Sequence, residues 1–186
     1  MEKESRSVYQ NPACMKYSVG ARRRRYKISA RLKEFIPQVG SLSSSSSSYP
    51  PVQEEVSRLV GSPEVRTAFE RFRAQESQFA LWQMEATRVA APPFGEAARG
   101  AWLADRFREL GLSDVQVDEV GNVFGIRPGY GSRFVALSAH IDTVFPAATP
   151  LHIRQQGSRL YGPGVSDNGA GIAAMLAVAS VLASAG

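Results

Sequence analysis

Two short motifs in the second half of the chain carry side chains of the kind that bind metal ions. The first is His140 followed by Asp142, at the end of an apolar run that starts at Phe134. The second is Asp167, which follows a glycine-rich turn and precedes an apolar helix-forming segment. Imidazole and carboxylate groups are zinc ligands in hydrolytic sites, which also keep an open position for water. Together the two motifs predict one half of a hydrolytic metal site.

The spacing within the first motif suggests a role for each of its side chains. In an extended backbone, His140 and Asp142 point to the same side. Asp142 would then accept the second imidazole N–H and fix the tautomer in which His140 binds a metal. Asp167 at a helix start can cap the helix, bind metal or do both. Each motif alone favours a structural role, and it is their joint occurrence that favours a metal site.

Two helices are predicted ahead of these motifs. Ser62 is a suitable N-cap, with Pro63 at the first helical position, and apolar residues recur at helical spacing as far as Val89. A second helix is predicted from about residue 95 to residue 110, with Gly111 as the residue just past its end. Its apolar stripe consists of Ala98, Trp102, Leu103, Phe107 and Leu110.

Strands are predicted between those helices and the last one. Alternating apolar residues over 115–126 predict a hairpin that turns at Gly121-Asn122. The continuous apolar run 134–137 predicts a central strand covered on both faces, and ligands of open α/β sheets collect where such strands end. A second hairpin, which turns at Gly157-Ser158, is predicted over 151–161. The order of elements predicts an α/β sandwich whose later strands are not present.

The charge of the chain is unevenly distributed. Residues 1–33 hold all four lysines and carry a net charge of +8, whereas the whole chain carries +5, which leaves −3 for residues 34–186. Ser43 to Ser48 form a serine homopolymer. We therefore predict that residues 1–60 are a disordered basic and serine-rich tail, and that residues 62–186 form the folded part. The basic pI belongs to the tail and does not by itself indicate a nucleic-acid partner.

The tail leaves more than one interpretation open. The stretch from Arg6 to Lys33 has no acidic residue, as in organellar targeting peptides. A solvated tail, or translation from a misassigned start codon, is the alternative that the lysine distribution favours. The single cysteine, Cys14, excludes an internal disulfide and a thiolate metal cluster. The first 40 residues lack an apolar leader, and the run from Ile172 is shorter than the ~20 residues that cross a bilayer. We therefore expect a cytoplasmic protein without a membrane partner.

The two motifs together resemble those of the M20 family of zinc peptidases and amidohydrolases, which includes tripeptide aminopeptidases, carboxypeptidases and aminoacylases. The resemblance rests on residues 139–144 and 161–169 and extends to residues 91–96 and 121–123. It covers roughly residues 62–186, about two thirds of the chain. Aminopeptidases of the M28 family also have His-x-Asp and Asp-Asn-x-x-Gly motifs, so they remain the second possibility.

The resemblance implies a fold and a set of roles. The fold would be a three-layer α/β sandwich of the zinc-exopeptidase type, truncated after the helix that follows Asp167. His140 would bind one of two Zn²⁺ ions, for which Co²⁺ or Mn²⁺ can substitute. Asp142 would be the catalytic residue that orients His140. Asp167 would bridge both ions, through a cis peptide bond to Asn168.

The chain departs from the family pattern after Asp167. The family places a Glu-Glu pair, a further acidic ligand and a late histidine downstream, but this chain has no acidic residue after Asp167. His152 comes too early, and its polar neighbours predict an exposed residue on a strand. The resemblance therefore implies the N-terminal part of a dinuclear zinc exopeptidase that acts on small peptides or N-acyl amino acids. This fragment would be inactive alone, and it lacks the domain through which the intact protein could form a homodimer.

A non-enzymatic alternative remains for the basic tail. The arginine block Arg22 to Arg25 could bind phosphates of nucleic acid or of an acidic membrane, with strong salt dependence. Only Tyr26 lies beside the block for base stacking, and no nucleic-acid-reading motif is present. We therefore expect no specific nucleic-acid partner.

Overall fold

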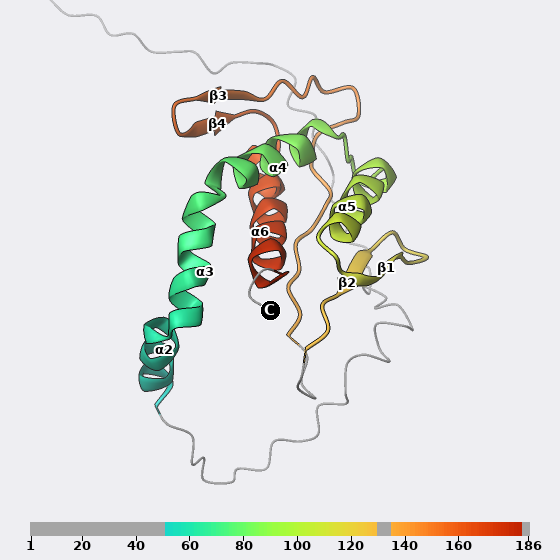
Figure 1. Cartoon of the computed structure of the whole chain (residues 1–186). Coiled ribbons are helices and arrows are strands. Elements are labelled where there is room, and N and C mark those ends of the chain that lie inside the picture. The colour runs from blue at the N-terminus through green and yellow to red at the C-terminus, as the bar shows by residue number, and fades with distance from the viewer. Residues whose placement is uncertain (1–50, 130–134, 184–186) are drawn as a thin grey trace, which may run out of the picture.

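The computed structural model describes residues 51–129 and 135–183 (Figure 1). The predictions for the tail up to residue 50, including those for Cys14 and the arginine block, lie outside this part. Its helices are α2 (Val52–Gly61), α3 (Pro63–Ala74), α4 (Glu76–Arg88), α5 (Ala97–Glu109) and α6 (Gly171–Ala183). Its strands are β1 (Ser113–Val117), β2 (Val123–Ile126), β3 (Arg154–Gln156) and β4 (Arg159–Tyr161), and an irregular turn, η1 (Val165–Ala170), precedes α6.

The predicted N-cap is confirmed, but the predicted helix is divided in two. The Ser62 hydroxyl oxygen accepts a hydrogen bond from the Val65 N–H at 3.3 Å, and Pro63 occupies the first turn. Helix α3 ends at Ala74 and α4 begins at Glu76, with Gln75 outside helical geometry between them. No proline or glycine marks this break, and the apolar residues keep their helical spacing on both sides of it. The sequence pattern therefore predicted one continuous helix.

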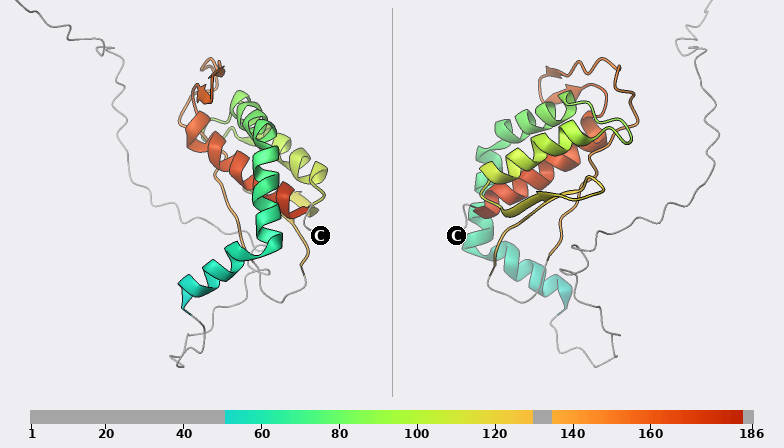
Figure 2. Two further views of the ribbon diagram at one scale, coloured as in Figure 1. Left: turned by 60° about the vertical axis from the view of Figure 1, so that its left-hand side comes forward. Right: turned by 90° about the vertical axis from the view of Figure 1, so that its right-hand side faces the viewer.

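Helix α2 is a correction to the prediction that residues up to 60 lack regular structure. Val52, Val56, Leu59 and Val60 recur at helical spacing after Pro51, and they form one side of α2. None of the α2 residues is buried, so the helix is supported by local propensity and its contact with α3 rather than by a core. Figure 2 shows α2 extending beyond the end of α3, away from the other helices. The division into a tail and a folded part stays a prediction.

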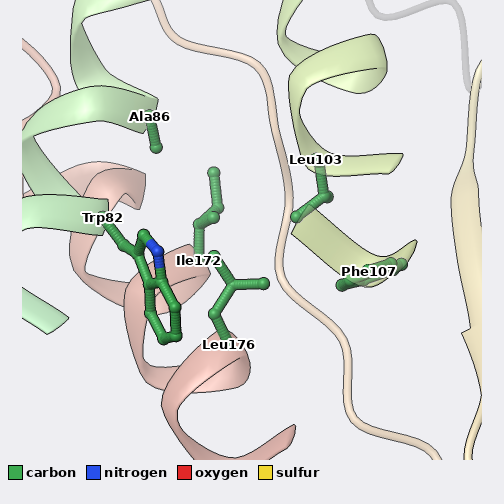
Figure 3. Packing of buried hydrophobic residues seen from close by; sticks show 6 residues of the cluster. All are labelled: Trp82, Ala86, Leu103, Phe107, Ile172 and Leu176. Carbon is green, nitrogen blue, oxygen red and sulfur yellow. The ribbon is translucent and has the colours of Figure 1, made fainter. Parts of the chain in front are cut away.

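The core lies where α4, α5 and α6 meet (Figure 3). Its central members are Trp82 and Ala86 from α4, Leu103 and Phe107 from α5, and Ile172 and Leu176 from α6. Helix α6 is apolar on nearly all sides, as expected for a buried helix. Within the described ranges, Val165–Ala183 is the one segment long and apolar enough to cross a membrane by length and composition, a test that a core helix also passes.

Both predicted hairpins are confirmed. Strands β1 and β2 pair antiparallel, with Val117 opposite Val123, and the Asp118 carboxylate closes their turn by accepting the N–H of Val120 and of Asn122. Strands β3 and β4 also pair antiparallel, and they turn at Gly157, whose φ is +60°.

The predicted central strand is not formed in the described residues. Residues 135–140 have no regular secondary structure, and the predicted first strand residue, Phe134, lies outside the described part. Val135 is 88% exposed and Leu137 is 54% exposed, whereas Ala139 and Ile141 pack against the core. Strand geometry needs a hydrogen-bonded neighbour, and in this part of the chain each hairpin pairs only with itself. The three-layer sandwich therefore stays a prediction.

The exposed apolar run has a measurable consequence. We expect the isolated chain to self-associate, because Val135, Leu137 and Val144 present apolar surface and unpaired backbone together. Leu137→Asp should reduce this association without changing the helical circular dichroism signal, which light scattering and chromatography can follow. A soluble wild-type monomer with a sharp cooperative melt would contradict the expectation.

Candidate functional site

The structure brings the two predicted motifs together around the imidazole of His140. The His140 Nδ1 atom lies 3.2 Å from Oδ1 of Asp142, and the Nε2 atom lies 2.9 Å from Oδ1 of Asp167. Both aspartates are therefore in hydrogen-bond contact with opposite nitrogens of one ring. The contact between His140 and Asp142 is therefore as predicted, whereas metal binding at the other nitrogen stays a prediction.

Asp167 is presented by the irregular turn η1 and not by a regular helix start. Asp167 and Asn168 have non-helical backbone angles, and the peptide bond between them is cis, as the resemblance implied. Among the described residues the Asp167 carboxylate contacts His140 and makes no helix-capping hydrogen bond. Capping, one of the roles considered for this residue, is therefore not seen among the described residues, and metal binding stays a prediction.

Side chains of α4 hold the turn η1 in place. The Gln83 amide donates a hydrogen bond to the Val165 carbonyl oxygen at 2.9 Å. Thr87 is buried and lies against Gly169, where an added Cβ atom would collide with the Thr87 hydroxyl oxygen. Gly164 has φ of +74°, a conformation that glycine adopts without strain. The position of Asp167 is thus fixed by a helix about 80 residues earlier in the chain.

Asn168 links the two motifs through the backbone. Its amide Nδ2 donates a hydrogen bond to the carbonyl oxygen of His140 at 2.9 Å. On the other side, the N–H of buried Thr143 donates to the carbonyl oxygen of Ala91 at 2.8 Å. The segment that carries His140 and Asp142 is therefore held at both ends.

One residue at the site was missed by the sequence analysis. Arg99 of α5 is 1% exposed and donates hydrogen bonds to the carbonyl oxygens of Val89 and Ile141. The predicted stripe placed Ala98 inside, but Ala98 is exposed. Arg99, Leu103 and Phe107 follow one another at intervals of four, so the spacing itself contained the signal. Arg99 was left out of the predicted apolar stripe because a charged side chain is not expected in a core.

The site is open to solvent and negatively charged. The side chain of His140 is 52% exposed and that of Asp167 is 82% exposed. Partial burial lowers the pKa of His140, but hydrogen bonds with Asp167 and Asp142, and their charges, outweigh this and raise the pKa above its usual value. His152 is exposed, as predicted, but it lies before β3 and not on a strand.

This direction of shift predicts how the metal-free protein responds to pH. The pKa of His140 is higher in the folded than in the unfolded protein. Its ion pairs therefore stabilise the fold fully below about pH 6.5, the pKa in the unfolded protein. This contribution is lost as the pH rises through the pKa in the folded protein. Asp142→Asn should lower the His140 pKa measured by NMR of the imidazole. Since the proton and a metal compete for the same nitrogen, zinc affinity should rise over the same pH interval. An unchanged pKa in Asp142→Asn would contradict the assignment.

The donor set fits zinc in part. Imidazole nitrogen and carboxylate oxygen are both zinc ligands, and His140 and Asp167 present one of each to the same point. Within residues 51–129 and 135–183, no group of three His, Cys, Asp or Glu side chains is placed to hold an ion. Asp142 contacts the opposite ring nitrogen, so it is not placed to bind an ion at Nε2. His140 and Asp167 can hold a zinc ion only together with ligands from outside this part of the chain.

Comparison with known proteins relates this region to hydrolases. Residues 122–186, which include all three predicted site residues, match Peptidase family M28. A LysW-lysine hydrolase of Deinococcus radiodurans is 39% identical over 87 residues, which cover 47% of this chain and 23% of the relative. A putative LysW-lysine/LysW-ornithine hydrolase of Pyrococcus abyssi is 30% identical over 50% of this chain and 26% of the relative. Carboxypeptidase G2 of a Pseudomonas species is 31% identical over 44% of this chain and 21% of the relative.

These similarities support a relationship to zinc peptidases and amidohydrolases in general. They do not single out the M20 family, and the M28 match supports the second possibility as well. The chain spans about a quarter of the length of the curated relatives it matches.

Proposed function

We propose that this chain provides the first half of a dinuclear zinc site in a hydrolase that cleaves peptide or N-acyl amide bonds of small substrates, as an exopeptidase. The observation that carries the proposal is the imidazole of His140 held between Asp142 and Asp167. The similarity to a carboxypeptidase and to LysW-lysine hydrolases supports the same class of reaction. The surrounding fold that we propose is the three-layer α/β sandwich.

Each site residue has a distinct task in this proposal. His140 would hold one ion through Nε2, and the Asp167 carboxylate, whose Oδ1 lies 2.9 Å from that nitrogen, would help to hold both ions. Asp142 accepts a hydrogen bond from the Nδ1–H group. This keeps the lone pair of Nε2 available for a metal and increases the basicity of that nitrogen. Zinc held by these residues would supply Lewis-acid activation of the scissile carbonyl and of a water molecule. The general base lies outside the described residues.

A substrate can reach these side chains directly from solvent. The side chains of Asp167 and His140 are both more than half exposed. We propose a short peptide or an N-acyl amino acid as the substrate. We place the enzyme in the cytoplasm, without a membrane or a specific nucleic acid as partner.

An aminopeptidase of the M28 type is the second candidate, because the matched family is M28. Both candidates use His140, Asp142 and Asp167 in the same way, so the site itself does not separate them. Proteins of the M28 type lack the inserted dimerising domain that the M20 type has. Sequencing the gene beyond the codon for Gly186 separates the two, and a Glu-Glu pair followed by a dimerising domain would favour M20.

The proposal is tested on the intact protein that contains this chain. Short peptides with free or blocked termini and N-acyl amino acids are incubated with it before and after metal removal. We expect hydrolysis that stops on chelation and returns with added Zn²⁺, Co²⁺ or Mn²⁺. Hydrolysis that persists at full rate in the metal-free protein, or an intact protein that binds no metal, would refute the proposal.

A further inference from the structure

Arg99 is a buried cation whose hydrogen bonds go to the main chain. Its Nε and Nη2 atoms donate to the carbonyl oxygen of Val89, at 3.0 and 2.6 Å, and its Nη1 atom donates to that of Ile141 at 2.8 Å. No carboxylate within the described ranges lies at ion-pair distance from it. Burial of an unpaired charge is costly, and apolar side chains often replace buried charges without loss of stability. Core packing alone therefore does not explain an arginine here.

The two carbonyl groups that Arg99 joins belong to different parts of the fold. Val89 directly follows the last residue of α4, and α4 also carries the side chains that hold η1. Ile141 lies between His140 and Asp142 in the sequence. The guanidinium group thus connects the helix that supports Asp167 to the segment that carries the other two site residues. Its planar set of donors reaches both carbonyls at once, which a single ammonium group does not.

We infer that Arg99 is a positioning residue, which fixes the His140–Asp142 segment against the end of α4. Because of this, the two ring nitrogens of His140 face Asp142 and Asp167. The inference rests on the proposed function for its significance, since the position it fixes is that of a zinc ligand. Thr143 adds to the same support, because its N–H is bonded to Ala91 in the connection that follows α4. Arg99 and Thr143 together prevent the 141–143 segment from moving away from α4.

The charge of Arg99 also acts on the site. Desolvation lowers the pKa of Arg99, and the negative charge of Asp142 opposes this by favouring the charged guanidinium. An arginine stays protonated in spite of such a shift. The buried guanidinium and the Asp142 carboxylate therefore attract each other, which adds to the hold of Arg99 on this segment.

The test compares three variants of the chain in two measurements. Arg99→Met removes the charge and the donors, and Arg99→Lys keeps the charge but not the planar set of donors. Leu103→Val is the matched control, because it loosens the same core one turn further along α5 without touching either carbonyl. Amide hydrogen exchange is measured in the metal-free intact protein at Thr143 and, for reference, at Leu176 in α6. Zinc affinity is measured in the intact protein at a temperature where every variant is folded.

We expect Arg99→Met to accelerate exchange at Thr143 more than at Leu176, and to weaken zinc binding by about 10–100-fold, the usual effect of losing a partner of a metal ligand. Arg99→Lys should have an exchange rate at Thr143 and a zinc affinity between those of Arg99→Met and the wild type. Leu103→Val should not accelerate exchange at Thr143 more than at Leu176, and it should leave zinc affinity unchanged. The inference is overturned if Arg99→Met accelerates both amides equally, or if its zinc affinity equals that of Leu103→Val. A wild-type protein that binds no zinc refutes the proposed function, and the exchange comparison then decides by itself whether Arg99 positions the segment.

Discussion

His140→Ala should remove zinc from the intact protein and abolish its hydrolytic activity. The reason is geometric, because the Nε2 atom of His140 lies 2.9 Å from the Asp167 carboxylate and supplies the nitrogen ligand of the predicted ion. Loss of a residue that only supports a metal ligand costs about 10–100-fold in affinity, so loss of the ligand itself should cost more than about 100-fold. Metal content after dialysis and the rate of peptide hydrolysis measure the two effects.

The chain provides a matched control for this experiment. His152 is the second of its two histidines, and it is exposed. His152→Ala should leave zinc content and activity at the wild-type level, while Asp142→Asn should give an intermediate loss because it affects the ligand through its second nitrogen. Wild-type metal content and hydrolysis in His140→Ala would rule out the assignment of this site.

Gly169→Ala should destabilise the fold and displace Asp167. A Cβ atom at position 169 would collide with the hydroxyl oxygen of Thr87 and would lie 3.0 Å from the carbonyl oxygen of Gly164. Both neighbours are held in place, since Thr87 is buried and donates its hydroxyl to the Gln83 carbonyl at 2.7 Å. Forcing a methyl group into a packed site costs about 1–3 kcal/mol. Denaturant unfolding and zinc titration should therefore both reveal the change.

Two further variants separate a local clash from a general effect of replacing glycine. A Cβ atom at Gly61 would meet no atom within 4 Å, so Gly61→Ala should be neutral or stabilising by about 0.4–1 kcal/mol. Thr87→Ala removes one of the two groups in the way of Gly169→Ala, so the double variant should recover part of the lost stability. Equal unfolding free energies for Gly169→Ala and the wild type would show that the turn adapts.

Local features of the fold were predictable because their causes are local. Ser62 and Pro63 mark a helix start by their own chemistry, and Gly111 takes a positive φ just after α5, as its position predicted. The turns at Gly121 and Gly157 were likewise predicted and formed. The break at Gln75 and the unformed strand at Val135 were not predictable, because each depends on which neighbours are present.

The candidate site also has features with local causes and features that depend on distant neighbours. The sequence alone determined the ligand types, since His140, Asp142 and Asp167 have the right chemistry, and the two-residue spacing places the first two on one side of an extended backbone. Only the tertiary structure decided that Nε2 of His140 meets a carboxylate 27 residues later in the chain. Such a contact depends on how α4 and α5 pack, and no periodicity within either motif encodes it.

Arg99 shows the same division most clearly. Its type marks it as a surface residue in any sequence pattern, and its interval of four from Leu103 marks it as a core position. The conflict is resolved by two carbonyl groups, at Val89 and Ile141, that reach the guanidinium only after the helices have packed. The sequence thus determined which groups are available for chemistry. The tertiary structure decided which of them meet, because hydrogen bonds between distant segments form only once packing has brought their partners within about 3 Å.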